Sequence, residues 1–357
     1  MKGFSQDETQ DFISRGLKGL KNKIAQALIP SDLRERLEQM VAQLEMVKLS
    51  ENFLLDFQRT SHYVEWAVSL PWQKQTTDNL DLNYARKILE KTHYGLDQIK
   101  QRILEYLSVL ILQKKRRAEE HIRAPILCFV GLVGTGKTTI AQAIAEALGR
   151  KFIRIPFGGL GDPFYLRGQS RFHPYAEPGY IIKGLKTAEA KNPVILLDEI
   201  DRVADDALNT IMGVLVELLD PEQNWQFTDY FLDYPFDLSQ ALFVATANNT
   251  NRIATAVLDR IEPIQMPSYS DQEKIVIGKE YLLPKVLEEA GLTEEELKIS
   301  DECWPLIVRP LGFDAGVRTL KRNIEGIARK VAMLIVEKKG ERFFVNKENI
   351  KQFLPEW

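Results

Sequence analysis

The sequence contains very little cysteine, which excludes the classes of protein that depend on it. Cys128 and Cys303 are the two cysteines among 357 residues, and they lie far apart along the chain. Two residues are too few for a zinc cluster, and no disulfide scaffold can be built from them. We therefore expect two buried thiols in a reducing compartment.

Long apolar runs and a strong charge imbalance are also missing. Apolar runs such as 195–197 and 241–245 are far below the roughly 20 residues that span a bilayer, so no membrane partner is expected. Lys and Arg total 47 against 50 for Asp and Glu, so overall basicity does not point to nucleic acid. The start of the chain has no apolar signal core and is too acidic for a transit peptide, which favours a cytoplasmic protein.

The apolar pattern predicts three domains, because 357 residues exceed what one core usually organises. Leu37, Val41 and Leu44 have the spacing of an amphipathic helix, and Ser31 is the expected cap. Helices are predicted at residues 11–60, 63–70, 82–90 and 96–117. The predicted domains are an N-terminal helical segment (1–75), an α/β domain (76–268) and a C-terminal α-helical domain (269–357).

Short apolar runs between residues 126 and 266 predict buried strands. Helical patterns separate these runs, and such alternation is typical of an α/β fold with a doubly wound parallel sheet. Beyond residue 269 we expect helices without a strand as far as residue 339, then a short edge strand at 342–345. The predicted strands of the sheet are 126–130, 152–155, 194–197, 241–245 and 262–266.

A glycine-rich segment after the first predicted strand matches the phosphate-binding pattern G-x-x-x-x-G-K-[ST]. Glycine lets backbone N–H groups surround a phosphate, and the helix that follows directs its positive end toward the anion. Lys137 is expected to reach the β- and γ-phosphates of a nucleotide, and the Thr138 hydroxyl to bind Mg²⁺. The predicted ATP- or ADP-binding residues of this phosphate loop are Gly131, Val133, Gly134, Thr135, Gly136, Lys137, Thr138 and Thr139.

Two carboxylates follow the apolar strand at 194–197. Asp198 and Glu199 should lie at the carboxyl edge of the sheet, where α/β sheets bind ligands. Asp198 is expected to hold Mg²⁺ through water, and Glu199 to polarise the attacking water. The pair stands about sixty residues after Thr138, in the order that a P-loop ATPase requires.

Several segments beyond the phosphate loop resemble the ATPase part of the Lon family of AAA+ proteases, from roughly residue 24 to residue 354. Residues 63–66 read Tyr-Val-Glu-Trp, and residues 93–96 read His-Tyr-Gly-Leu. Residues 219–224 read Leu-Asp-Pro-Glu-Gln-Asn, and residues 243–248 read Phe-Val-Ala-Thr-Ala-Asn. The resemblance implies an AAA+ P-loop fold in which the C-terminal helical domain is a lid.

The resemblance also implies roles for single residues. Asn248 corresponds to sensor 1, which orients water, or simply caps a turn at the end of a strand. Arg260 corresponds to an arginine finger that acts on a neighbouring subunit, or forms a surface ion pair with Asp259 or Glu262. Arg318 corresponds to sensor 2 on the lid. Adenine-pocket or plain packing roles are implied for Tyr94, Gly95 and Leu96.

The expected substrate-gripping pore loop departs from the family pattern. Lon-like proteins carry an aromatic–aliphatic pair there, and His173 and Pro174 occupy its place, between Phe172 and Tyr175. A proline stiffens such a loop, and the aromatic register is changed. Phe172, His173 and Tyr175 are therefore the predicted polypeptide contacts.

The function expected from these features is ATP hydrolysis by a homo-oligomer, a hexameric ring by resemblance, that unfolds or translocates polypeptide. No peptidase nucleophile can be placed in the sequence, so proteolysis would need a protease domain in trans. The alternative is a nucleotide-regulated binding module or chaperone that unfolds nothing. The basic run at 114–117 is either a solvated helix end or a weak DNA contact.

Overall fold

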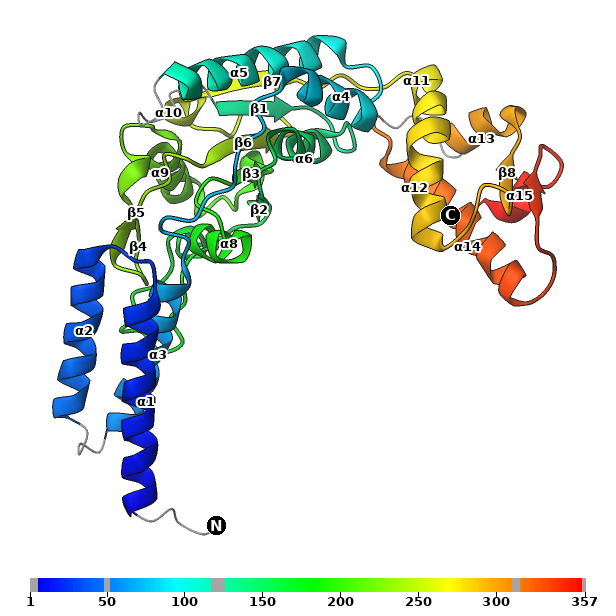
Figure 1. The fold of residues 1–357 in the computed structure, drawn as a ribbon. Coiled ribbons are helices and arrows are strands. Elements are labelled where there is room, and N and C mark those ends of the chain that lie inside the picture. The colour runs from blue at the N-terminus through cyan, green and yellow to red at the C-terminus, as the bar shows by residue number, and fades with distance from the viewer. Residues whose placement is uncertain (1–5, 48–51, 117–125, 310–314, 355–357) are drawn as a thin grey trace.

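The computed structural model describes residues 6–47, 52–116, 126–309 and 315–354. A central α/β module carries a bundle of three helices at one end and a smaller, mostly helical domain at the other (Figure 1). Within the described residues, no helix is long and apolar enough to cross a membrane.

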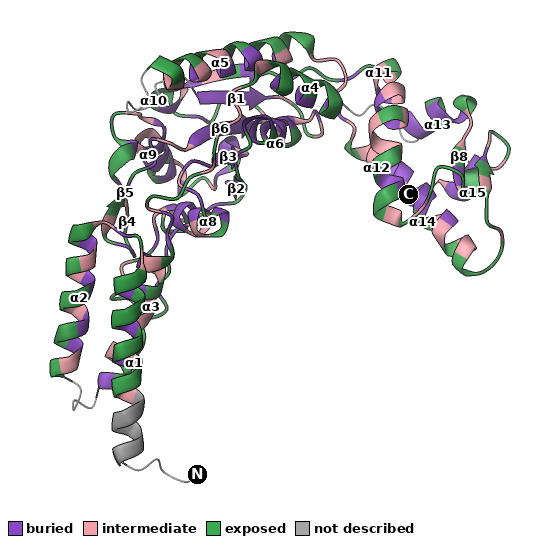
Figure 2. Ribbon diagram, viewed as in Figure 1, coloured by how far each residue is buried: buried purple, intermediate pink, exposed green. Residues whose placement is uncertain are grey.

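The centre of the module is a parallel five-stranded sheet with the strand order β2-β3-β6-β1-β7. Every residue of β1, β3 and β6 is buried, which explains why these strands are continuous apolar runs (Figure 2). The predicted α/β class and all five predicted strands are confirmed. The strands are β1 (Ile126–Val130), β2 (Phe152–Pro156), β3 (Val194–Asp198), β6 (Leu242–Ala247) and β7 (Ile261–Gln265).

Helices cover both faces of this sheet, and alternate strand residues supply the two cores. Leu127 and Phe129 pack with helices α4, α5 and α6, whereas Cys128 packs on the opposite face with α8 and α9. Cys128 and Cys303 are both free and buried, as predicted. The helices are α4 (Leu82–Thr92), α5 (Asp97–Arg116), α6 (Lys137–Leu148), α7 (Phe164–Arg167), α8 (Tyr180–Ala188), α9 (Leu208–Leu219) and α10 (Thr255–Leu258).

The N-terminal bundle consists of α1 (Gln6–Gln26), α2 (Ser31–Met46) and α3 (Phe53–Ser69). Leu37, Val41 and Leu44 are buried in it, as their spacing predicts. The prediction of one helix over 11–60 is wrong, because the chain leaves the helix before Pro30 and again after Met46. Ser31 is the first helical residue and not a cap, and α3 runs through the predicted break before residue 63.

A buried ion-pair cluster fastens the segment between the bundle and the module. Asp78 accepts two hydrogen bonds of 2.8 Å from the guanidinium of Arg150, which is itself buried and donates to the carbonyl of Gln240. Lys114 also pairs with Asp78. The first residue of the basic run is therefore not a solvated helix end, and Arg117 lies outside the described residues.

The C-terminal domain packs its helices around the buried Trp304. Two three-residue strands pair in parallel there, so the prediction of no strand before residue 339 is wrong, whereas the edge strand near its end is confirmed. Ser270 and Glu273 form a complete capping box at the start of α11. The elements are α11 (Asp271–Val276), a π-helical turn (Ile277–Leu282), α12 (Leu283–Ala290), β8 (Leu297–Ile299), α13 (Trp304–Val308), α14 (Arg318–Val336), β9 (Phe343–Val345) and α15 (Ile350–Phe353).

Short elements fill the connections of the module. The hairpin of β4 and β5 lies next to the N-terminal bundle, where the Tyr63 hydroxyl donates to the carbonyl of Leu232 over 2.8 Å. These elements are β4 (Phe227–Asp229), β5 (Tyr234–Phe236) and the 3₁₀ turns Ile200–Arg202, Asn224–Gln226 and Asp301–Cys303.

Candidate functional site

The phosphate loop lies between the carboxyl end of β1 and the first turn of α6. Gly134 and Gly136 have φ angles of +83° and +95°, which side chains with a Cβ rarely adopt. Lys137 is buried, and its ammonium donates to the loop carbonyls of Gly131 and Leu132 and approaches Asn248 Oδ1 at 3.4 Å. Burial lowers the pKa of Lys137, and the charges of Glu199 and Asp198 oppose that change.

The two predicted carboxylates lie at the end of β3, beside the loop. Thr246 donates its hydroxyl hydrogen to Asp198 and accepts the backbone N–H of Glu199 over 2.9 Å. Arg154 on β2 donates from Nε and Nη2 to Asp198 Oδ2 at 2.7 and 2.6 Å. Glu199 has a φ of +59°, an uncommon backbone conformation that is often found at functional sites.

Asn248 lies at the end of β6, between the phosphate loop and the carboxylates. The buried carboxylate of Asp201 fixes this turn by accepting the backbone N–H groups of Asn248 and Asn249 at 3.0 and 3.3 Å. The side-chain nitrogen of Asn248 is buried without a protein partner. A buried donor of this kind fits a ligand oxygen or a bound water, because an unsatisfied donor is costly.

A buried histidine directly after α4, to which the sequence analysis assigns no role, supports the loop. The His93 ring lies 2.9 Å from the Thr139 hydroxyl, which in turn donates to the carbonyl of Gly136. Thr138, the predicted Mg²⁺ ligand, is the second residue of α6 and is half-buried. Burial, aided by the charge of Lys100, lowers the pKa of His93 to about 4.

This low pKa of His93 predicts a pH-dependent stability. Between about pH 6.5 and pH 4 the unfolded chain takes up a proton that folded His93 rejects, so stability is lost as the pH falls through this range. The loss attributable to His93 is about 3 kcal/mol at most, from 1.36 kcal/mol for each unit of pKa. We expect the urea-unfolding midpoint of His93→Gln to change less between pH 8 and pH 5 than that of the wild type. In the control His173→Gln, which replaces an exposed histidine, the midpoint should depend on pH as in the wild type. Equal slopes in wild type and His93→Gln would contradict this account.

The C-terminal domain contacts the phosphate loop directly, as a lid would. The backbone N–H of Val317 donates to the carbonyl of Gly134 over 3.0 Å, and α14 begins at the next residue, Arg318. The Tyr269 hydroxyl donates to the carbonyl of Thr135 over 3.3 Å. The structure thus brings the backbone of the predicted sensor-2 residue to the loop, and its side chain is exposed.

Gly316 makes this lid contact possible, and its replacement provides a test. A Cβ atom at Gly316 would lie 2.5 Å from the carbonyl oxygen of Val133 and 2.6 Å from the Cα of Gly134. We expect Gly316→Ala to weaken nucleotide binding about tenfold, since overpacking typically costs about 1–3 kcal/mol. Titration with a fluorescent ADP analogue measures the change. The control is Gly213→Ala, where a Cβ meets nothing within 4 Å; equal affinities in the two variants would contradict the prediction.

The predicted adenine-pocket residues lie between α4 and α5, beside the lid. The ring of Tyr94 packs edge-on against Tyr281, with ring centroids 6.3 Å apart. Gly95 and Leu96 both have positive φ angles, of 60° and 58°, and Leu96 packs against the core. Tyr94 therefore connects the module to the lid, next to the loop that His93 supports.

Arg260 lies at the amino ends of the strands, whereas the phosphate loop lies at their carboxyl ends. Its carbonyl accepts the N–H of Ile126 at the start of β1, whereas the loop follows the end of β1, roughly 16 Å further along the strand. The guanidinium donates to Asp220 Oδ2 at 2.9 Å and to the carbonyl of Ala256 at 2.8 Å. The alternative prediction, an ion pair of Arg260 with Asp259 or Glu262, is therefore wrong about the partner, because Arg260 pairs with Asp220.

The predicted pore loop, residues 171–179, is anchored at its base and exposed at its tip. The Phe172 and Tyr175 side chains are 77% and 98% exposed, and His173 is exposed as well. Arg171 instead turns back and lies 4.6 Å above the ring of Tyr63 in the N-terminal bundle. The loop therefore presents its aromatic rings to solvent.

A buried carboxylate ties the base of the pore loop to the β4–β5 hairpin. Asp229 accepts backbone N–H groups from Gly179 at 2.7 Å and from Phe231 at 2.8 Å. Burial raises the pKa of Asp229 to about 6, and these backbone hydrogen bonds oppose the rise. The sequence contains no local signal for this contact, because its partners are about fifty residues apart.

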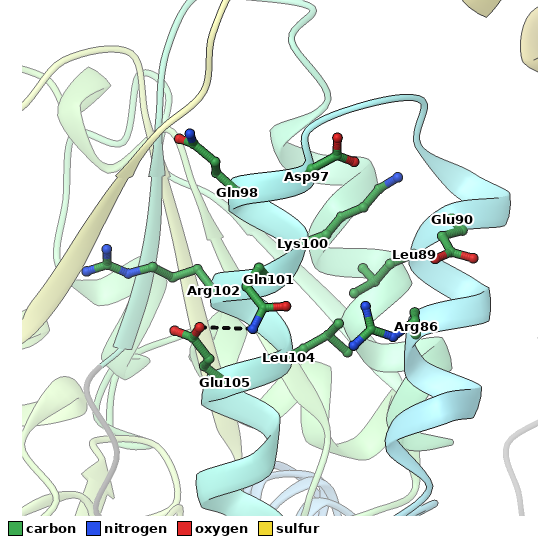
Figure 3. Close-up of a pocket in the computed structure, with 10 residues that line it drawn as sticks. All are labelled: Arg86, Leu89, Glu90, Asp97, Gln98, Lys100, Gln101, Arg102, Leu104 and Glu105. Carbon is green, nitrogen blue, oxygen red and sulfur yellow. Dashed lines mark hydrogen bonds between the residues drawn. The ribbon is translucent and has the colours of Figure 1, made fainter.

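A charged groove of about 650 Å³ between α4 and α5 involves none of the predicted site residues (Figure 3). Side chains of both signs face one another across it, and Gln101 donates to Glu105 over 3.0 Å. Its lining is therefore distinct from the phosphate loop and the carboxylates of β3. The groove is lined by Arg86, Leu89, Glu90, Asp97, Gln98, Lys100, Gln101, Arg102, Leu104 and Glu105.

Comparison with known families agrees with the fold and with the arrangement of the site. Residues 127–269 match the ATPase family associated with various cellular activities (AAA). Residues 288–343 match the Lon protease AAA+ ATPase lid domain. The parallel sheet, the phosphate loop and the helical lid thus define an AAA ATPase module.

More narrowly, the chain is an AAA+ ATPase module with a lid of the Lon protease type. It is 41% identical over 347 residues to a Lon protease of Heliobacterium modesticaldum, covering 97% of this chain and 42% of the relative. A Lon protease of Dictyoglomus thermophilum is 42% identical over 336 residues, or 94% of this chain and 41% of the relative. A Lon protease of Lawsonia intracellularis is 40% identical over 370 residues, or 99% and 44%. The chain thus spans about two fifths of the length of these relatives.

Proposed function

We propose that this chain hydrolyses ATP and uses the energy to unfold or translocate polypeptide as part of a homo-oligomeric ring. The observation that carries the proposal is the meeting of Lys137, Asp198, Glu199 and Asn248 at one edge of the sheet. A cation, two carboxylates and an unpaired amide donor beside a glycine-rich loop are the groups that phosphoryl transfer requires.

In this proposal the phosphate loop and Lys137 bind the nucleotide phosphates. Thr138 and Asp198 would hold Mg²⁺, which supplies charge neutralisation on the phosphate oxygens when bound. Lys137 can exchange the loop carbonyls that it now contacts for phosphate oxygens, which are stronger partners for an ammonium. Arg154 must share Asp198 with the metal or release it.

Glu199 acts as the general base, and Asn248 positions the water. Glu199 has a left-handed backbone conformation, which ends β3 and turns the chain sharply directly after Asp198. Asn248 Nδ2 has no partner within the protein and can donate to that water or to a phosphate oxygen. Glu199 takes up the proton of the water during attack.

Arg260 completes the site of a neighbouring copy. Since Arg260 lies at the far edge of its own sheet from its own phosphate loop, it is suited to a site in trans. Arg318, at the start of α14, contacts the phosphates within the same subunit. A ring, hexameric as the family resemblance suggests, supplies each site with both arginines.

The exposed rings of Phe172 and Tyr175 are the proposed contacts with unfolded polypeptide, together with His173. Asp229 connects their loop to the module, so movement of the module is transmitted to the loop. A protease domain, in trans or elsewhere in the polypeptide, would receive the unfolded chain.

The test is ATP hydrolysis measured against protein concentration, with and without casein. A turnover per subunit that rises with concentration, and again with casein, supports an assembling motor coupled to substrate. Hydrolysis that casein does not stimulate would favour the second candidate, a nucleotide-regulated binding module or chaperone. The altered pair His173 and Pro174 in the predicted pore loop supports this candidate. Absence of hydrolysis at every concentration would overturn the ATPase proposal.

A further inference from the structure

We propose that Asp220 is a positioning residue for catalysis in the neighbouring subunit, because it holds the Arg260 guanidinium in the orientation needed there. The inference rests on the proposed function of Arg260 as a finger in trans. It adds a residue that touches neither nucleotide nor metal in its own subunit.

Two partners from two different elements fix the Arg260 fork. One terminal nitrogen donates to the carbonyl of Ala256, in the helix α10 just before it, over 2.8 Å. The other donates to Asp220 Oδ2, directly after α9, over 2.9 Å. The remaining hydrogens of these two nitrogens are left for a third partner, since a guanidinium carries five N–H donors.

Asp220 is itself held rigidly. Its Oδ1 accepts the backbone N–H of Glu222 at 2.9 Å, which closes a turn over Pro221, and its Oδ2 also accepts Gln223 Nε2 at 3.0 Å. The hydrogen bond from Arg260 lowers the pKa of Asp220, so the carboxylate stays charged at neutral pH. The orientation of the guanidinium is therefore set before a neighbour arrives, which reduces the entropy lost on binding.

The position of the pair in the module also fits an action on a neighbour. The side chains of Arg260 and Asp220 are 28% and 16% exposed, so the pair is partly open to solvent. Helices α9 and α10 lie toward the end of the module away from the lid, whereas the phosphate loop contacts the lid (Figure 1). An arginine presented at this end cannot reach the phosphate loop of its own chain.

The first test is steady-state ATP turnover of Asp220→Asn. Asparagine can keep the turn to Glu222 but removes the negative charge that faces Arg260. We therefore expect ATP affinity and oligomer size to stay unchanged and turnover to fall about 10- to 100-fold. The control Asp259→Asn removes an exposed carboxylate one residue from Arg260 and is expected to turn over like wild type. Asp220→Glu, which keeps the charge, is expected to be less impaired than Asp220→Asn.

The decisive readout is complementation in mixed oligomers. Glu199→Gln subunits lack the base but carry an intact finger, so adding them to Asp220→Asn subunits should restore turnover in the Asp220→Asn sites. A mixture of Arg260→Ala and Glu199→Gln subunits shows how much turnover is restored when the finger itself is supplied by the neighbour. A purely structural role within one subunit predicts no rescue.

The outcomes separate this inference from the proposed function. Wild-type turnover in Asp220→Asn, increased turnover, or loss without rescue while Arg260→Ala is rescued would each overturn the role of Asp220. Full turnover in Arg260→Ala, or no rescue of Arg260→Ala, would overturn the finger in trans itself, and the role of Asp220 with it.

Discussion

Glu199→Gln is expected to bind ATP with unchanged or higher affinity and to hydrolyse it about 10²- to 10⁴-fold more slowly. The amide has nearly the shape of the carboxylate but cannot accept the proton of the attacking water, and general-base catalysis contributes about this factor. Because the left-handed backbone at Glu199 is held by the Thr246 hydroxyl, the glutamine should keep the position of the parent side chain.

Single-turnover hydrolysis and retention of labelled ATP on a gel-filtration column measure the effect of Glu199→Gln. The control is Glu146→Gln, an exposed residue in the last turn of α6, far from the phosphate loop, which should turn over normally. If Glu199→Gln turned over like the parent, another group would have to be the base.

Arg260→Ala is expected to keep ATP binding and to lose about 10³-fold or more in turnover. Removal of an arginine finger leaves transition-state charge on the phosphoryl oxygens uncompensated, and such fingers are worth about 10³–10⁵ in rate. Arg260 contacts Asp220 and Ala256 at the far edge of the sheet, so its loss should leave the phosphate loop of its own subunit unchanged.

Binding and turnover of Arg260→Ala must be compared at equal oligomer size, measured by light scattering. Arg342→Ala is the control, since it removes an exposed arginine that pairs with Glu295, and exposed pairs contribute little. Equal losses of binding and turnover in Arg260→Ala would argue against the finger.

The sheet and the phosphate loop could be predicted because their signals are local. A strand buried on both faces must be a continuous apolar run, and the glycines and Lys137 are specified by chemistry within eight residues. The strand Leu297–Ile299 was missed for the opposite reason, because a three-residue strand has no periodicity to detect. The helix break before Ser31 did have a local signal, since Pro30 disfavours a helical conformation at the residue before it.

The supporting residues were missed because their partners are distant in sequence. His93 is 46 residues from Thr139, Arg154 is 44 from Asp198, and Asp220 is 40 from Arg260. A histidine, an arginine or an aspartate alone has many roles, and tertiary placement decides among them. His93 and Asp220 lie in segments that resemble the Lon family, but the resemblance implies no role for either residue on its own.

The placement of Arg260 and the phosphate loop at opposite edges of the module gives any assembly a polarity. In an open row of copies, the Arg260 of the first copy would contact no neighbouring nucleotide site, and the nucleotide site of the last copy would lack an arginine from a neighbour. A row of n copies would then contain n − 1 complete sites, and only closure on itself would complete all of them. Turnover per subunit in such a protein reports not just whether copies associate but whether the row has closed.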